Sequence, residues 1–410
     1  MLLLALLSVT CFACSSKSDI RTVDPIDEQS NLALRNLERA IGIIDTSLLF
    51  YFTGEDMAMS RFYNPLTKVR SKERASVWMY TSAIESVNAV LRSLTLAKEN
   101  GHMDLYETNF ARYTDLLAKL YSNADYYLGT FELTSFTQTK TWSVYAVDRV
   151  NQKGEANVGG VLNVYDDQMW LIRELLESYQ LTSEVAYLQK AEYLTAYVLD
   201  GWDTTLDEKG KENGGIPWGP GYVTKHACSN GPLISSLVWL HEVYADKDTE
   251  IEYRYIDAQD HQTRTTIMKP KAVYYLDYAK KIYDWQYNNL RNGQGIYTDM
   301  MGGCGDCKIV YEHIQGVRYR ANTKLTEPVG EAYTYNSGTM LSGAVDLYRA
   351  TRESKYLDDL KSLSEASFLN FAHLDKELPG YYSYETEGFR NWFNGVLLRG
   401  FIDVYDNHIE

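Results

Sequence analysis

The chain has 410 residues, of which 45% are hydrophobic and 23% charged, so it is long enough for a buried core and has the composition of a soluble globular protein. Its formal net charge is −15 and no block rich in Lys and Arg stands out, which argues against a nucleic-acid partner because phosphate backbones are repelled. The chain also contains 34 Tyr, 8 Trp and 12 Phe, and aromatic rings suit the apolar faces of sugars, although many of them are expected to fill helix interfaces.

The N-terminal residues have the pattern of a targeting segment. Residues 2–13 form an apolar run too short to span a bilayer, and Cys14 follows with a polar stretch behind it. This resembles a bacterial lipoprotein signal, although no Lys or Arg precedes the run and Cys11 stands where Leu is usual. We expect a signal peptide and acylated Cys14 over residues 1–14, then a flexible tether over 15–28. The chain would be an exported bacterial lipoprotein at the outer membrane, cell surface or periplasmic face; a buried first helix is the alternative.

Apolar residues at helical spacing dominate the rest of the chain. In residues 73–98, for example, Val77, Ile84 and Leu91 fall on one helix face. No alternation of apolar and polar residues lasts long enough to predict a sheet, and short strands are expected only near 250–268 and 308–326. Helices are expected at about 30–52, 73–98, 105–127, 166–180, 184–200, 232–246, 271–290, 337–351, 355–373 and 390–406.

A repeat indicates how these helices pack. Tyr-Leu pairs beginning at Tyr187, Tyr275 and Tyr356 each open a helix that follows another helix and a short polar turn. Helical hairpins bury their faces only against neighbours, and closing roughly ten to twelve helices into a double ring covers every face. We therefore predict one all-α domain over residues 29–410, a barrel of alternating inner and outer helices. An open solenoid is the alternative, disfavoured by irregular spacing and by long loops rich in Gly and Trp.

Asp166 and Asp167 stand side by side at the start of a predicted helix. A helix N-terminus favours ionising one carboxyl group, while the like charge beside it raises the pKa of the other. That difference suits a nucleophile beside a general acid. Adjacent residues can hold carboxyl groups roughly 5–6 Å apart, the separation found in retaining rather than inverting glycosidases. The simpler interpretation is helix capping, and we expect the other such pair, Asp358 and Asp359, to lie on a solvated helix face without a role.

The surroundings of the first pair resemble a known family. Residues 165–170 and the segment behind them, to Thr182, are similar to the catalytic signature of glycoside hydrolase family 76, which contains endo-α-1,6-mannanases. The resemblance covers about residues 75–407 and implies an (α/α)6 barrel in which Asp166 is the nucleophile and Asp167 the acid/base. Further matching segments are Gly201–Thr204, Gly214–Trp218, Cys228–Gly231, Tyr333–Gly338 and Phe389–Gly400.

The matching segments also supply candidate substrate contacts. Trp202 and Trp218 can stack on sugar rings or fill the barrel mouth. Asp299 lies outside the matching segments and can bind a hydroxyl group or act as a further carboxylate. Asn230 and Asn336 follow turn-like segments, where Asn often caps a helix instead. The expected substrate-binding residues are Tyr165, Trp202, Trp218, Asn230, Asp299, Tyr335 and Asn336.

No metal or other cofactor is expected. Cys304 and Cys307 form a lone C-x-x-C without the two further ligands that zinc needs, and a local disulfide and two free thiols are both left open. His226 is expected to be structural or exposed rather than catalytic.

Together these features predict a monomeric retaining glycosidase, and the resemblance implies that its substrate is α-1,6-linked mannan and that its action is endo. A transglycosylase using the same residues and a non-catalytic glycan-binding lipoprotein are alternatives, and a helical scaffold for other proteins is a third. Ser337 and Pro217 depart from the family's pattern, and residues 250–268 and 301–325 look like local additions. These departures leave the fine structure of the substrate open.

Overall fold

The computed structural model describes residues 25–407, and its helices lie where the sequence predicts them. The first helix begins at Pro25, inside the segment 15–28 that was expected to be a tether, whereas Cys14 and the expected signal peptide lie outside the described residues. Within residues 25–407, no helix combines the length and apolar character needed to cross a bilayer. The ten described helices are α1 (Pro25–Tyr51), α2 (Val77–Glu99), α3 (Met103–Ala124), α4 (Tyr165–Thr182), α5 (Val185–Asp200), α6 (Leu233–Tyr244), α7 (Lys271–Leu290), α8 (Thr334–Thr351), α9 (Ser354–Phe371) and α10 (Arg390–Asp406).

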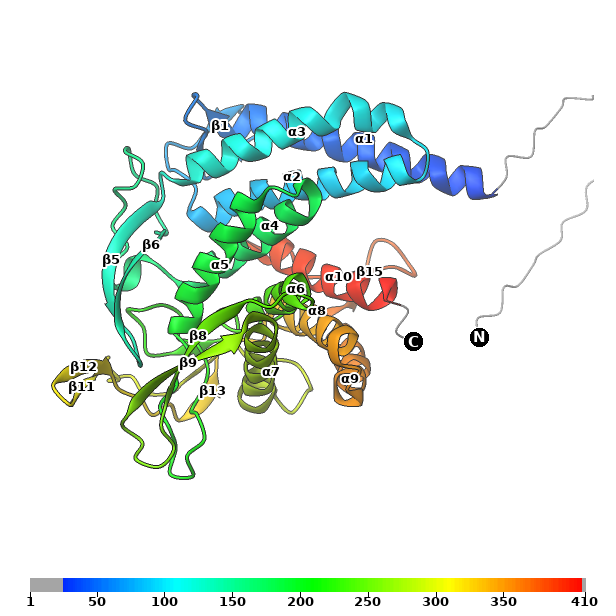
Figure 1. Ribbon diagram of the computed structural model, residues 1–410. Coiled ribbons are helices and arrows are strands. Elements are labelled where there is room, and N and C mark those ends of the chain that lie inside the picture. The colour runs from blue at the N-terminus through cyan, green and yellow to red at the C-terminus, as the bar shows by residue number, and fades with distance from the viewer. Residues whose placement is uncertain (1–24, 408–410) are drawn as a thin grey trace, which may run out of the picture.

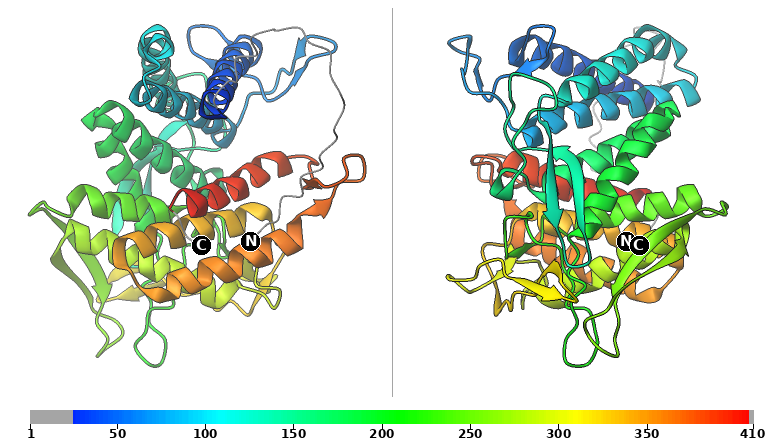
Figure 2. Two further views of the ribbon diagram at one scale, coloured as in Figure 1. Left: turned by 90° about the vertical axis from the view of Figure 1, so that its right-hand side faces the viewer. Right: turned by 60° about the vertical axis from the view of Figure 1, so that its left-hand side comes forward.

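Alternate helices form an inner and an outer layer (Figure 1). The inner helices α2, α4, α6, α8 and α10 contact one another in this order, and α3, α5, α7 and α9 each pack as the outer arm of a hairpin. The ring closes between α10 and α2, where Arg399 Nη1 donates to Glu85 Oε1 at 2.5 Å and the rings of Trp392 and Trp78 meet edge to face with centroids 5.0 Å apart. Figure 2 shows the same layers from two other sides. The predicted barrel of inner and outer helices is confirmed.

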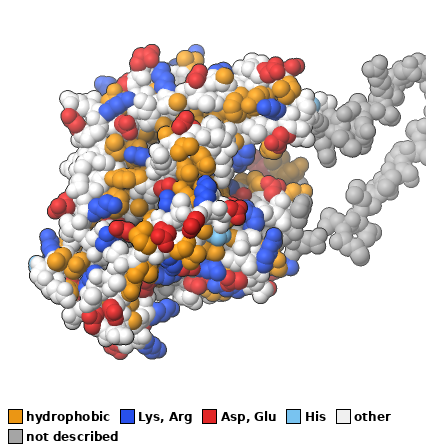
Figure 3. Space-filling model, viewed as in Figure 1, with side chains coloured by type: hydrophobic (Ala, Val, Ile, Leu, Met, Phe, Trp, Pro, Cys, Tyr) orange, Lys and Arg blue, Asp and Glu red, His pale blue; other side chains and the backbone are white. Residues whose placement is uncertain are grey.

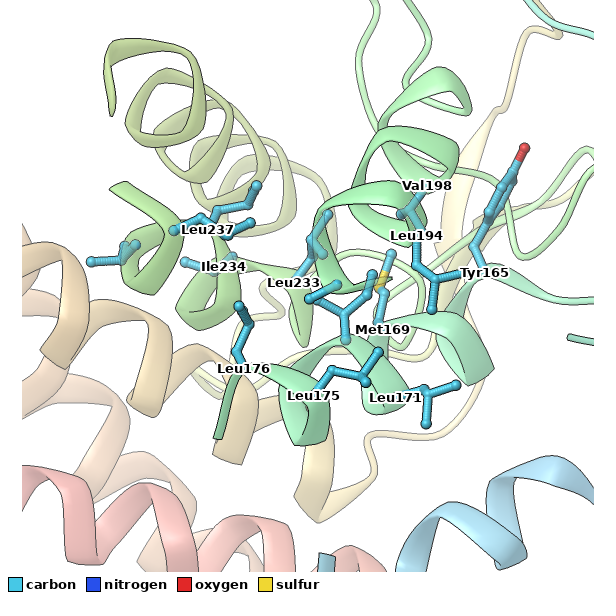
Figure 4. Close-up of a cluster of buried hydrophobic side chains, with 14 of the residues drawn as sticks. Tyr165, Met169, Leu171, Leu175, Leu176, Leu194, Val198, Leu233, Ile234 and Leu237 are labelled. Carbon is cyan, nitrogen blue, oxygen red and sulfur yellow. The ribbon is translucent and has the colours of Figure 1, made fainter. Parts of the chain in front are cut away.

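The apolar core lies between the inner helices and their outer partners (Figure 4). Met169 and Leu175 of α4 point into a cluster with Leu194 of α5 and with Leu233 and Leu237 of α6, and none of these side chains is more than 2% exposed. Burying a side chain of this size stabilises the fold by roughly 1.5–3 kcal/mol. The cluster therefore fixes the position of α4, the helix that carries the paired aspartates.

The inner ring also encloses charged groups, which are paired. Glu174 of α4 accepts hydrogen bonds from Arg173 Nη1 at 2.5 Å and from Asn88 Nδ2 of α2 at 2.9 Å. Glu177, one turn further along α4, forms an ion pair with Arg92 of α2. Glu174 and Glu177 are buried, whereas the Arg92 side chain is half exposed. The bond from Asn88 to Glu174 and the pair of Arg92 with Glu177 join α2 to α4.

Strands occur in the loops between helices and are more numerous than predicted. The expected strands near 250–268 and 308–326 are present as two hairpins. The first pairs β8 (Glu250–Ile256) with β9 (Arg264–Pro270), and the second pairs β11 (Tyr311–Ile314) with β12 (Val317–Arg320). The expectation of no other sustained alternation is wrong for β5–β6, a hairpin paired from Leu128 opposite Tyr145 to Thr134 opposite Thr139. Its alternation is weak in the sequence because Thr and Ser occupy many positions and several side chains are only half-buried.

The strands pair mostly as two-stranded hairpins, and one three-stranded sheet has the order β13–β10–β7. The strand bounds are β1 (Phe52–Thr53), β2 (Ala58–Met59), β3 (Tyr63–Asn64), β4 (Val69–Arg70), β5 (Leu128–Thr134), β6 (Thr139–Tyr145), β7 (Lys225–His226), β8 (Glu250–Ile256), β9 (Arg264–Pro270), β10 (Met300–Gly302), β11 (Tyr311–Ile314), β12 (Val317–Arg320), β13 (Glu327–Val329), β14 (His373–Leu374) and β15 (Tyr382–Ser383).

The sequence left open whether Cys304 and Cys307 form a disulfide, and the structure shows that they do.

Asp358 is exposed as expected, but Asp359 is only partly exposed and accepts a hydrogen bond from the Tyr283 hydroxyl at 3.0 Å. The prediction of a solvated pair is wrong for Asp359, because α9 turns that side chain toward α7.

Candidate active site

One end of the inner ring opens into a pocket of about 780 Å³. The first turns of four inner helices reach its lining, through Trp78 of α2, Asp166 of α4, Tyr335 of α8 and Trp392 of α10. Each helix N-terminus carries partial positive charge, so the four together favour negative charge in the pocket. This is the end of the barrel at which the sequence places its paired aspartates.

Asp166 faces this pocket with several hydrogen-bond donors around it. Its Oδ1 accepts a hydrogen bond from Trp218 Nε1 at 3.1 Å, and the Cys228 thiol and the backbone N–H groups of Asp166 and Asp167 also bond its carboxyl group. Burial raises the pKa of Asp166 to about 6, and these hydrogen bonds limit the rise because they favour the charged form. Asp166 is therefore mainly ionised at neutral pH.

Asp167 lines the same pocket but is held in the other protonation state. Its side chain is buried, and burial raises its pKa well above the usual value. The negative charge of Asp166 raises that pKa further. Two adjacent carboxyl groups therefore share one pocket at neutral pH, one ionised and the other protonated.

A tightly packed loop positions the indole of Trp218. The backbone N–H of Tyr165, at the start of α4, donates to the Trp218 carbonyl at 2.8 Å. Gly219 follows so close to the same segment that a Cβ atom there would lie 2.6 Å from the Asn163 carbonyl oxygen. The loop is thus fastened to the helix that carries Asp166, and only glycine fits at its closest approach.

His226 and Asp299 meet at the pocket because β7 pairs with β10. His226 stands opposite Met300, and Asp299 immediately precedes β10, which leaves 3.8 Å between His226 Nδ1 and Asp299 Oδ2. Burial lowers the pKa of His226 to about 4 and raises the pKa of Asp299 to about 6. At neutral pH the imidazole is neutral and stacks on the Trp218 indole with ring centroids 4.9 Å apart, while Asp299 presents a carboxylate to the pocket.

Cys228 is a free, buried thiol in the pocket wall. It hydrogen-bonds both the Asp166 carboxyl group and Tyr335. Burial raises the pKa of the thiol well above its usual value, and the negative charges of Asp166 and Asp299 raise it further. The thiol therefore keeps its proton at neutral pH and acts as a donor to Asp166.

The remaining wall of the pocket is aromatic. Trp170 and Trp392 meet edge to face with centroids 4.8 Å apart, and Trp78 meets Trp392 in the same way. Tyr333 and Tyr335 stack with centroids 6.0 Å apart at the start of α8. Such rings offer apolar surfaces of the size of a sugar ring beside the carboxyl groups.

The structure brings five of the predicted site residues together in this pocket: Asp166, Asp167, Trp218, Asp299 and Tyr335. Tyr165 and Trp202 lie behind the wall instead. The Tyr165 ring is 1% exposed and packs on Gly201, while Trp202 is 3% exposed and donates its indole N–H to Glu212 at 2.8 Å. Both rings fill space in the fold and have no free face for a sugar.

Asn230 and Asn336 are also placed away from the pocket lining, because both are fully buried. The Asn230 amide donates to the carbonyl oxygens of Ile216 at 3.0 Å and His226 at 2.7 Å, and its Oδ1 accepts from the Ile216 N–H. It therefore fastens the loop ahead of Trp218, which is a structural role. The amide of Asn336 has no hydrogen-bond partner among the described residues.

Several residues that line the pocket were not predicted as site residues, among them Trp78, Trp170, His226, Cys228, Tyr333 and Trp392. Trp170 and Cys228 belong to segments that the sequence singled out, so a search of every residue in those segments finds them. The role of His226 depends on the pairing of β7 with β10, which has no local signal. Among residues 25–407, no group of three or more His, Cys, Asp or Glu side chains is arranged to hold a metal ion.

An ionised carboxylate beside a protonated carboxyl group can attack an acetal carbon while its neighbour protonates the leaving oxygen. Comparisons with known proteins give a family match. The family model described as Glycosyl hydrolase family 76 matches residues 99–248 and 267–403. The gap in this match coincides with most of the β8–β9 hairpin, which the sequence marks as a local addition. No curated protein sequence matches the chain.

Solved structures with similar folds come from the same family. A family 76 mannosidase from Bacteroides thetaiotaomicron has a TM-score of 0.61 and 22% identity, over 90% of this chain and 81% of that chain. An α-mannanase from the same organism has a TM-score of 0.57 and 18% identity, over 92% and 81%.

A third similar structure is an inactive variant of an α-1,6-mannanase from Salegentibacter sp., with two consecutive aspartates replaced by asparagine, in complex with α-1,6-mannotriose. It has a TM-score of 0.53 and 20% identity, over 90% of this chain and 80% of that chain. Structures of this family are (α/α)6 barrels, so the predicted fold class is confirmed.

Proposed function

Because the chain belongs to glycosyl hydrolase family 76, we propose that it hydrolyses α-1,6-linked mannan with retention of configuration, Asp166 being the nucleophile and Asp167 the acid/base. One observation carries the assignment of roles. Hydrogen bonds from Trp218 and Cys228 favour the ionised form of Asp166, whereas burial and the charge of Asp166 keep the proton on Asp167. The two groups are therefore in the states that a nucleophile and a general acid need.

The reaction has two displacement steps. In the first, a carboxylate oxygen of Asp166 attacks the anomeric carbon, the bond from that carbon to the glycosidic oxygen breaks, and Asp167 gives its proton to the departing oxygen. In the second, the ionised Asp167 takes a proton from water, whose oxygen attacks the same carbon and releases Asp166. Each step inverts the anomeric centre, so the product keeps the configuration of the substrate.

The pocket offers a place for the sugar that is cleaved. Its aromatic wall, with Trp170 and Trp392, can pack against the apolar face of a mannose ring, and the carboxylate of Asp299 can accept hydrogen bonds from hydroxyl groups. The Salegentibacter relative supports the substrate, since its description names α-1,6-mannanase activity, a bound α-1,6-mannotriose and an inactive variant with two consecutive aspartates replaced.

The test uses unbranched α-1,6-mannan with the unchanged chain and with Asp166→Asn and Asp167→Asn. Each substitution should lower kcat/KM by about a thousandfold or more, while Asp358→Asn, on an exposed face of α9, should leave it unchanged. An aryl α-mannoside with a very acidic phenol needs no proton from the enzyme in the first step. Asp167→Asn should therefore still release the phenol, and Asp166→Asn should not.

Product analysis completes the test. NMR of the first product should show the α anomer before it equilibrates with the β anomer, and initial appearance of the β anomer would contradict retention. Long fragments should appear before single mannose units if the action is endo. Addition of a mannose acceptor separates hydrolysis from transglycosylation, because only the latter yields elongated products.

A lipid anchor at Cys14 on an exported chain is part of the same proposal. It is supported by the apolar run of residues 2–13 and by the polar residues that follow Cys14. Labelling of producing bacteria with a fatty acid should mark the unchanged chain and not Cys14→Ser.

A further inference from the structure

A basic hairpin follows α1. Residues 61–74, which include β3 and β4 and are called here the basic hairpin, hold five basic residues and one acidic residue: Arg61, Lys68, Arg70, Lys72, Arg74 and Glu73. The whole chain has the opposite balance, with 40 Lys and Arg against 55 Asp and Glu. The basic residues do not stand out as a block in the sequence because apolar and polar residues separate them.

The same hairpin exposes apolar side chains. Leu66 in its turn is 92% exposed, and Val69 and Phe62 are more than half exposed. Residues 62–71 surround an open hollow. In Figure 2 the segment that follows α1 stands out from the body of the molecule. Exposed apolar side chains at a projecting turn, with basic residues beside them, suit a surface that is apolar within and anionic at its boundary.

The basic hairpin is fastened to the C-terminal end of α1. The Arg70 guanidinium donates to the backbone carbonyls of Leu49 and Phe50, which lie in the last turn of that helix. Tyr63 of β3 stacks on the Phe50 ring with centroids 4.7 Å apart. The hairpin and α1 therefore present one continuous surface.

The outer face of α1 has the same character as the hairpin. Leu32, Ile43 and Leu49 are 48%, 65% and 67% exposed, and Arg35 and Arg39 are exposed on the same side of the helix. In the space-filling view, hydrophobic side chains reach the surface between charged ones along the edge where Figure 1 places α1 and α3 (Figure 3).

Acidic side chains near this surface are mostly paired. Asp45 of α1 binds Arg112 at 2.9 Å, and Glu55 binds Lys119 at 3.0 Å. Glu73 of the hairpin pairs with Arg61 at 3.8 Å, and Glu38 remains as an exposed acidic residue at the margin of the α1 face. The surface as a whole is therefore basic, although the protein is acidic.

We infer that the outer face of α1 and the basic hairpin rest on an anionic lipid bilayer. Basic side chains are attracted to anionic headgroups, and Leu66 at the projecting turn enters the boundary of the acyl region. The expected anchor at Cys14 precedes the N-terminal end of α1, whereas the hairpin lies at its other end, about 40 Å along the helix. Attachment at both ends lays α1 along the membrane.

This surface does not include the residues of the pocket. The pocket lining includes no residue of α1 and none of residues 61–74. Contact of this surface with lipid therefore covers no side chain that the proposed reaction uses.

The test measures cosedimentation of the full chain with vesicles. The chain carries Cys14→Ser so that no acyl group contributes to binding. Vesicles of phosphatidylcholine mixed with phosphatidylglycerol should bind it, vesicles of phosphatidylcholine alone should bind it much less, and added salt should weaken the binding. The double variant Lys68→Glu, Lys72→Glu should bind about 25-fold more weakly or worse, because each lysine near the surface contributes about fivefold.

Matched controls separate this surface from a general charge effect. Lys308→Glu with Lys361→Glu makes the same charge change at two other exposed lysines and should bind like the parent chain. Leu66→Ser should weaken binding by about tenfold, whereas Leu369→Ser, at an exposed position of α9, should not. Hydrolysis of soluble mannan should be the same in all these variants, which shows that they fold.

Three results would overturn the inference. They are equal binding of the two lysine double variants, equal binding to neutral and anionic vesicles, and no binding by the parent chain. Immobilised alginate, an acidic polysaccharide, serves as a further arm. If the hairpin variants lose alginate binding while vesicle binding is unaffected, the surface recognises a charged glycan and not a bilayer.

Discussion

The indole N–H of Trp218 donates to Asp166 Oδ1 at 3.1 Å, which joins a loop after α5 to the first turn of α4. The bond holds the carboxylate in place, and it also favours the ionised form of Asp166. The position of the loop therefore influences the pH range in which Asp166 can act as a nucleophile. The first predictions follow from this relationship.

Trp218→Phe should move the acid limb of activity to higher pH. In the unchanged chain kcat/KM should rise as Asp166 ionises at about pH 6 and fall at higher pH as Asp167 loses its proton. Phe keeps a ring but offers no N–H, so the pKa of Asp166 rises by about one unit and the limb moves with it. The profile of kcat/KM against pH measures this, with Trp202→Phe as a control that should not move the limb.

Substitutions at Cys228 should separate hydrogen bonding from space filling. The buried thiol donates a hydrogen bond to Asp166, and Cys228→Ala removes this donor. The acid limb of the pH profile should therefore move to higher pH, with about a tenfold loss of kcat/KM at pH 6. Cys228→Ser retains a donor of similar size and should leave the limb near its original place. Equal effects of Ala and Ser on the pH profile would show that the thiol acts only by filling space.

Asp166→Asn should stabilise the fold at neutral pH while removing activity. The pKa of Asp166 is about 6 in the folded protein and about 3.9 in the unfolded chain. Burial of its negative charge therefore does not lower the free energy of unfolding below about pH 4 and lowers it by the full amount above about pH 6. The substitution should raise the free energy of unfolding by about 3 kcal/mol at about pH 8 and by nothing at about pH 3.5. Urea unfolding at both pH values measures this; equal gains at both would contradict it, and Asp358→Asn should give none.

The helices could be predicted because each carries its own apolar period, as Val77, Ile84 and Leu91 do on α2. The position of a single aromatic side chain in a loop could not be predicted in this way. Trp202 and Trp218 lie in similar loops, yet one donates to Glu212 behind the wall and the other to Asp166 in the pocket. Nothing in the neighbouring sequence distinguishes the two, because the difference depends on how the loop folds back onto α4.

The acidic half of the pocket was only partly predictable for a related reason. Asp166 and Asp167 are adjacent in sequence, so their pairing needs no tertiary information. His226 and Asp299 are neighbours because β7 and β10 pair, and strands of two and three residues have too little pattern to be recognised. The sequence therefore indicated Asp299 as a candidate without its partner.

Gly215→Ala should destabilise the fold. Gly215 has φ +76°, and a Cβ atom there would lie 2.3 Å from Trp285 Cε2, so Ala is strained by its backbone and clashes with a buried ring. We expect a loss of about 2–4 kcal/mol in the free energy of unfolding. Activity should fall as well, because the same loop carries Trp218. Gly293→Ala has open space and should change stability by less than about 1 kcal/mol in the same thermal or urea measurement.

Asp299→Asn should weaken substrate binding, and it should change the acid limb of the pH profile less. Asp299 lines the pocket 3.8 Å from a neutral His226, so its carboxylate is not neutralised by that ring and remains free to accept hydrogen bonds from sugar hydroxyl groups. Loss of a charged acceptor costs about 1.5–3 kcal/mol, so kcat/KM on mannan should fall by roughly ten- to a hundredfold. Its pKa, about 6, is close to that of Asp166, and the two groups must therefore be distinguished experimentally.

Comparing two substrates distinguishes them. An activated aryl mannoside fills only the subsite of the cleaved sugar. If Asp299 binds that sugar, Asp299→Asn should lower kcat/KM for the aryl mannoside as much as for mannan. A loss seen with mannan alone places the contact at a neighbouring sugar. An acid limb that stays at about pH 6 in Asp299→Asn but moves in Trp218→Phe assigns that limb to Asp166. Loss of the acid limb in Asp299→Asn would instead show that the ionisation of Asp299 controls the rate.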